Sequence, residues 1–102
     1  MTLSEVIEAL EQFPADAPTS RSFTRPHSYR GDYESLAVER SSLPSTMGCH
    51  VMMLRDCVGS CFSGWKGGEF WMYEETDVYI ASVGSSDGAE PMAMESLLSW
   101  LL

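Results

Sequence analysis

Positive charge is scarce in this chain. Its 102 residues contain six Lys and Arg against fifteen Asp and Glu, which gives a formal net charge of −9. Contact with the phosphates of duplex nucleic acid requires a broad basic surface, and docking on anionic lipid requires basic clusters. We therefore expect neither duplex nucleic acid nor a membrane among the partners of this protein.

Long apolar runs are lacking as well. A membrane-spanning helix needs roughly 20 consecutive apolar residues, and no stretch of the chain approaches that length. Residues 1–5 lack the basic start and the long apolar segment of a signal peptide. Hydrophobic residues make up 44% of the chain, which is ordinary for a folded globular protein. We expect one domain over residues 1–102, in an intracellular protein.

Cysteine and histidine are few. The three cysteines, Cys49, Cys57 and Cys61, are odd in number and do not have the paired C-x2-C spacing of structural zinc sites. We expect buried or free thiols, and neither a metal nor a cofactor. The sequence contains no nucleophile elbow, phosphate loop or dinucleotide fingerprint. His27, oriented by Asp32, remains as a possible general base, but we do not expect an enzyme.

The pattern of apolar residues predicts three helices. An apolar stripe at helical spacing predicts the first over residues 2–13, which Pro14 ends. The second runs from a capping hydroxyl near residue 46 to about residue 58. The third covers residues 91–102, begins at Pro91 and is apolar on nearly every side.

Several short segments are rich in aromatic and β-branched residues, which predicts strands. These segments are residues 21–24, 33–40, the two arms of a hairpin over 61–73, and 78–83. Pro26 ends the first strand or confines it to a sheet edge, and residues 27–31 form a loop. The predicted fold is α+β, a small antiparallel sheet with two or three helices packed on it.

Half of the basic residues fall within ten positions, where Arg21, Arg25 and Arg30 alternate with aromatic residues. A guanidinium group binds phosphate through a planar fork, and aromatic rings offer stacking faces to a base. A later glycine-rich segment adds a lysine and backbone amides that a ligand can approach closely. The candidate ligand-binding residues are Arg25, His27, Tyr29, Arg30, Gly31 and Tyr33 from the first segment, and Phe62, Trp65, Lys66 and Gly67 from the second.

These two segments resemble a known family. The paired patterns are Ser28-Tyr29-Arg30-Gly31-x-Tyr33-x-x-Leu36-Ala37-x-Glu39 and Phe62-x-Gly64-Trp65-Lys66-Gly67-Gly68-x-Phe70-x-Met72, within residues 20–83. They resemble the phage Thoeris anti-defence sponges, which sequester cyclic ADP-ribose isomers made by bacterial TIR-domain enzymes.

The resemblance implies a phage protein for immune evasion in the host cytoplasm. It implies an α+β homo-oligomer, a dimer or hexamer, that holds a cyclic nucleotide signal at subunit interfaces without cleaving it. Some members of the family also bind cyclic oligonucleotides at a second site. Arg30 and Phe62 match the ligand-holding Arg and Phe of the family, with Tyr29, Gly31 and Lys66 beside them. The chain departs from the family pattern after Met72.

The net charge of −9 also fits a second hypothesis. An acidic protein can imitate DNA or otherwise bind a basic surface, and so inhibit a host defence enzyme. Such an inhibitor would spread Asp and Glu over one face and would bind its partner in a salt-sensitive way.

The apolar helix predicted over residues 91–102 generates the first testable expectation. A soluble monomer rarely exposes so much apolar surface, so this helix should pack on another subunit or on an uncovered sheet face. Size-exclusion chromatography with light scattering distinguishes the two. A monomer at micromolar concentration would rule out the oligomer.

Overall fold

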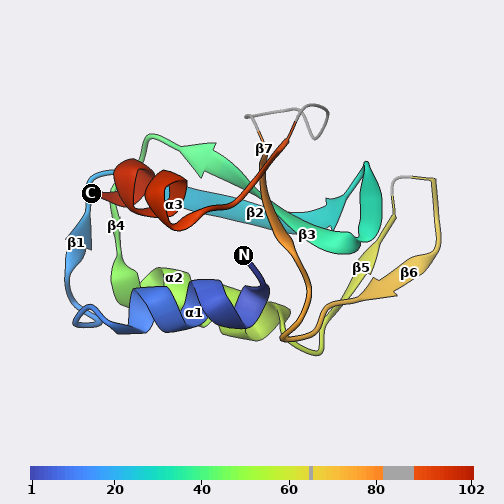
Figure 1. Ribbon diagram of the computed structural model, residues 1–102, viewed down its shortest axis with the longest axis horizontal. Coiled ribbons are helices and arrows are strands. Elements are labelled where there is room, and N and C mark those ends of the chain that lie inside the picture. The colour runs from blue at the N-terminus through green and yellow to red at the C-terminus, as the bar shows by residue number, and fades with distance from the viewer. Residues whose placement is uncertain (65, 82–88) are drawn as a thin grey trace.

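The computed structural model describes residues 1–64, 66–81 and 89–102. Within these ranges the chain forms an α+β fold of three helices and eight strands (Figure 1). The helices are α1 (Leu3–Glu11), α2 (Met47–Cys57) and α3 (Met94–Leu101). The strands are β1 (Pro18–Thr19), β2 (Ser22–Tyr29), β3 (Asp32–Ser41), β4 (Ser45–Thr46), β5 (Cys61–Ser63), β6 (Glu69–Trp71), β7 (Val78–Ala81) and β8 (Glu90–Pro91). In the described part of the chain, no helix is long and apolar enough to cross a membrane.

The first two helices confirm the prediction from apolar spacing and caps. The Thr2 hydroxyl accepts the backbone N–H of Glu5, and the Glu5 carboxylate accepts the N–H of Thr2, which forms a complete capping box. These bonds lower the pKa of Glu5. The Thr46 hydroxyl caps α2 by accepting the N–H of Cys49. The two helices pack side by side below the sheet in Figure 1.

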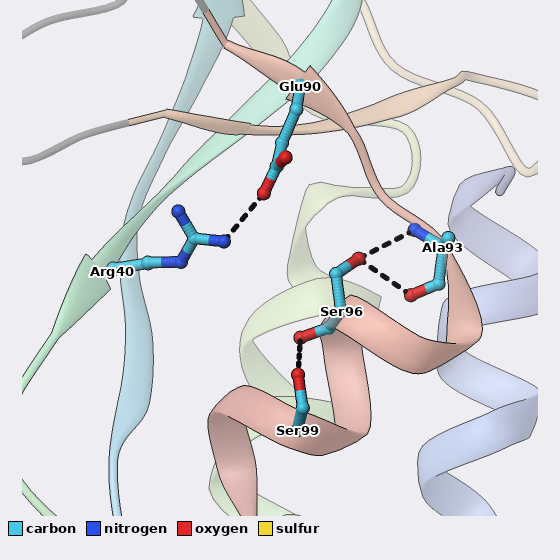
Figure 2. A network of polar contacts seen from close by, with 5 residues as sticks. All are labelled: Arg40, Glu90, Ala93, Ser96 and Ser99. Atoms are coloured by element: carbon cyan, nitrogen blue, oxygen red, sulfur yellow. Dashed lines mark hydrogen bonds and ion pairs between the residues drawn. The ribbon is translucent and has the colours of Figure 1, made fainter.

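The third helix begins later than the sequence predicted. Pro91 lies in β8 opposite Tyr79, and α3 starts only after Ala93. The Ser96 hydroxyl accepts the N–H of Ala93 and donates to the Ala93 carbonyl, both at 3.0 Å (Figure 2). Ser96 therefore supplies the hydrogen-bond partner of the Ala93 N–H from within the first turn of α3. The sequence pattern had instead predicted that the helix begins at Pro91.

The C-terminal end of α3 is fastened to the start of β2. The Trp100 indole N–H donates to the Ser22 carbonyl at 2.6 Å. The Arg21 guanidinium lies 3.8 Å from the Trp100 ring centroid and donates to the carbonyls of Trp100 and Ser99, both at 2.9 Å. A cation at this end complements the helix dipole. Leu97 and Leu101 are fully buried, so α3 packs within its own chain.

The main sheet has the order β2-β3-β7-β8 and is mixed. Strands β2 and β3 form an antiparallel hairpin, but β3 and β7 are parallel, with Val38 opposite Ile80. The prediction of a purely antiparallel sheet was therefore wrong at this pair. A parallel pair needs a long crossover, and here α2 and the β5–β6 hairpin supply it. Two separate two-stranded sheets, β1–β4 and β5–β6, complete the fold.

The prediction of a loop over residues 27–31 was wrong for residues 27–29, which belong to a strand. Strand β2 continues through Pro26 to Tyr29, with an irregularity in pairing between Thr24 and His27. Arg25, at this bulge, has a φ of 51°, in the left-handed region. Proline has no amide N–H to donate to a neighbouring strand. It is tolerated here because β2 is an edge strand, with a partner on one side only among the described strands.

One face of the sheet carries the core. Leu36 and Val38 on β3, with Val78 and Ile80 on β7, join a single buried cluster with residues of all three helices. Successive side chains of a strand point to opposite faces. Ala37 and Tyr79, which are paired across the strands, therefore lie on the face away from this core.

His50 occupies a buried position between α2 and β2. Only 3% of its surface is exposed. Its Nε2 accepts the backbone N–H of Phe23 at 3.0 Å, and its Nδ1 lies 2.8 Å from the Thr46 carbonyl, to which it donates. This tautomer satisfies two backbone groups, so His50 is a structural residue. Burial lowers its pKa below the ordinary value of 6.5.

The lowered pKa of His50 predicts a loss of stability in mild acid. As pH falls below about 6.5, the unfolded chain gains a proton that the folded chain resists, so the free energy of unfolding decreases by up to about 1.4 kcal/mol per pH unit. Above that pH this effect is absent. Urea unfolding between pH 7.5 and 5.5 measures it.

A pair of histidine variants serves as control. His27→Gln should keep the pH-dependent loss, and His50→Gln should abolish it at the cost of lower stability at neutral pH. Equal slopes in wild type and His50→Gln would contradict the assignment.

Candidate functional site

The structure brings the two predicted ligand-binding segments together within one chain. The β5–β6 hairpin contacts the β2–β3 hairpin, and the turns of both lie at the same end of the molecule (Figure 1). The Tyr33 and Phe70 rings meet with centroids 5.1 Å apart at 52°. This ring contact joins the first segment to the second, and no second subunit is needed for it.

Tyr29 and Gly31 pack against each other. The Tyr29 ring stacks on Tyr79 of β7, with centroids 4.5 Å apart and planes 22° apart. A Cβ added at Gly31 would lie 2.7 Å from the Tyr29 ring, closer than any real contact. Gly31 is therefore required for the close approach of this ring. One face of Tyr29 is already covered by Tyr79, which limits what it can offer a ligand.

His27 lies on the sheet face away from the core, opposite Ala37. Its Nδ1 is 2.7 Å from the Arg25 carbonyl and 3.9 Å from a Glu39 carboxylate oxygen. The alternative in which Asp32 orients His27 does not match these contacts. Asp32 instead accepts hydrogen bonds from the Ser35 hydroxyl at 3.1 Å and from the N–H of Glu34 at 3.2 Å.

The second segment is a tight hairpin whose glycines serve its turn. Gly67 has a φ of 98°, and its N–H donates to the Gly64 carbonyl at 3.0 Å. This amide is thus engaged within the turn, and its predicted role at a ligand remains a prediction. Phe62 is half-buried and packs on the core, opposite Phe70. Lys66 is exposed, and Trp65 lies outside the described residues.

The basic residues fall into two groups. The first group serves the fold: Arg21 binds the end of α3, Arg40 donates to Glu90 at 2.6 Å (Figure 2), and Arg55 pairs with Glu11. The second group consists of Arg25, Arg30 and Lys66, all exposed on the two candidate segments.

A hollow of about 590 Å³ lies beside the contact between the two hairpins. Its walls come from the start of β3, from β6, and from the turn that precedes β7. We call it the acidic groove; it is lined by Asp32, Glu34, Ser35, Glu69, Phe70, Trp71, Tyr73, Glu75, Thr76 and Asp77. Five of these residues are carboxylates and none is Lys or Arg, so the groove repels phosphate.

Sequence reasoning missed both Tyr79 and the acidic groove. Nothing in the composition of the predicted strand shows that Val78–Ala81 pair in parallel with β3 and so bring Tyr79 to Tyr29. The alternation of Glu69 and Trp71 with Phe70 and Met72 does place the first two on one face. That alternation was a usable sign of the groove.

The three cysteines have different surroundings. Cys57 is buried, which raises its pKa to about 11. Cys49 is exposed, and hydrogen bonds from the hydroxyls of Thr46 and Ser45 lower its pKa. Within residues 1–64, 66–81 and 89–102, no group of His, Cys, Asp and Glu has the arrangement of a metal site.

Comparison with protein-family models, with curated proteins and with solved structures found no match to this chain.

Proposed function

We propose that this chain is a binding protein without catalytic turnover, which sequesters a cyclic nucleotide signal at its paired hairpins. The ligand class is that of the cyclic ADP-ribose isomers, as implied by the resemblance to the phage anti-defence sponges. The host cytoplasm is then its place of action. The observation that carries the proposal is the Tyr33–Phe70 contact, because it holds the two halves of the paired pattern against each other.

The exposed cations of these hairpins supply the charge that such a ligand needs. Arg30 lies between the end of β2 and the start of β3, and Lys66 lies between β5 and β6. A guanidinium group and an ammonium group on neighbouring turns suit the two phosphates of a cyclic dinucleotide or a pyrophosphate. The carboxylates of the acidic groove repel the phosphates of such a ligand, so we do not expect the ligand inside the groove.

Assembly of several copies belongs to the same proposal. Tyr29 is stacked on Tyr79 and Phe62 packs on the core, so these two candidate rings are partly covered within one copy. A second subunit can supply the missing stacking surface. We therefore propose a homo-oligomer, a dimer or hexamer, with the ligand at a subunit interface.

Loss of Arg30 tests the site. A charge-assisted hydrogen bond contributes about 1.5–3 kcal/mol, so Arg30→Ala should weaken binding of a cyclic ADP-ribose isomer by roughly tenfold to a hundredfold or more. Isothermal titration calorimetry with a panel of cyclic nucleotides gives the dissociation constants.

Arg55→Ala is the matched control, since it removes an exposed arginine from α2, away from both hairpins. It should bind like the wild type. Equal binding by Arg30→Ala and wild type would refute the site. Absence of binding to every nucleotide in the panel would refute the function.

A further inference from the structure

The acidic groove exposes two large aromatic side chains. Trp71 is 52% exposed and Tyr73 is 58% exposed, and both line the groove together with half-buried Phe70. Aromatic residues carry much of the binding energy at protein interfaces and are usually covered in the absence of a partner. Their exposure inside a concave surface therefore marks a place where something docks.

The walls of the groove are fixed in place. The Thr76 hydroxyl accepts the N–H of Tyr73 at 2.8 Å, and the Thr76 carbonyl accepts the N–H of Leu3 at 2.7 Å. The Asp77 carbonyl accepts the N–H of Leu36 on β3 at 2.9 Å. These bonds tie the turn before β7 to the start of α1 and to the sheet. The aromatic side chains thus stand on a supported backbone, which limits the entropy lost when a partner binds.

The charge of the groove selects the kind of partner. Its five carboxylates are a third of the fifteen acidic residues in the whole chain, and they lie around the exposed rings. Mutual repulsion of these carboxylates decreases when a cation enters. A guanidinium group satisfies both features at once, because it stacks on an aromatic face and binds carboxylates through its planar fork.

We propose that the acidic groove docks an arginine-bearing segment of a partner protein. The guanidinium groups stack on Trp71 and Tyr73 and donate hydrogen bonds to carboxylates such as Glu69 and Glu75. The volume of about 590 Å³ accommodates a few side chains of an extended segment. This surface adjoins the proposed nucleotide site, since Phe70 belongs to both, but its carboxylates carry the opposite charge to Arg30 and Lys66.

A fluorescein-labelled hexa-arginine peptide is the probe, and its fluorescence anisotropy with the full chain is measured at near-physiological salt. Trp71→Ala keeps every charge and should weaken binding by about fivefold, in line with the strength of a cation–π contact. The pair Glu69→Gln/Glu75→Gln should weaken binding by about tenfold, because charge-assisted hydrogen bonds are lost. A hexalysine peptide, which stacks poorly, should bind several times more weakly than hexa-arginine.

The matched control is Glu8→Gln/Glu95→Gln, which removes the same charge from exposed positions on α1 and α3. Circular dichroism and thermal unfolding verify that each variant is folded. The proposal is overturned if Trp71→Ala binds the peptide as tightly as wild type. It is also overturned if the control pair weakens binding as much as the groove pair, since net charge alone would then explain the attraction.

Discussion

The parallel pairing of β3 with β7 is the constraint on which the rest of the structure depends. Parallel neighbours cannot be joined by a tight turn, so the chain must travel back along the sheet between them. That return path holds α2 and the β5–β6 hairpin. It sets the hairpin beside the β2–β3 turn, where Phe70 meets Tyr33. It also places Tyr79 against Tyr29 and brings Asp77 to the start of β3. Both proposed surfaces arise from this single pairing.

The elements that depend on local signals could be predicted from the sequence. Thr2 and Thr46 are hydroxyl residues that cap the first two helices, and the glycines between β5 and β6 form the expected turn. The direction of β7 could not be predicted, because a short apolar strand has the same residue pattern in a parallel and in an antiparallel sheet. The start of α3 was missed because Pro91 suits an edge strand as well as a helix.

The candidate site shows a similar division. The sequence correctly associated the two segments, since the structure places them in contact. It could not assign individual roles. Gly31 and Gly67 were both predicted beside the ligand, and the structure shows that the first makes room for Tyr29 and the second closes a turn. Apart from the alternation at residues 69–72, the sequence contained no sign of the acidic groove, because its carboxylates come from separate segments that each resemble an ordinary solvated surface.

The bulge at Arg25 and the proline beside it also bear on how copies of this chain can meet. An edge strand with an unbroken row of amides invites another strand to pair with it, which is a common route to fibrous aggregation. Strand β2 interrupts that row at Arg25 and Pro26, and the opposite edge, β8, consists of Glu90 and Pro91 alone. Both edge strands of the main sheet are thus poorly suited to pairing with a strand from another molecule. A protein that accumulates to high concentration would gain solubility from such edges, because they give strands of other copies few amides to pair with.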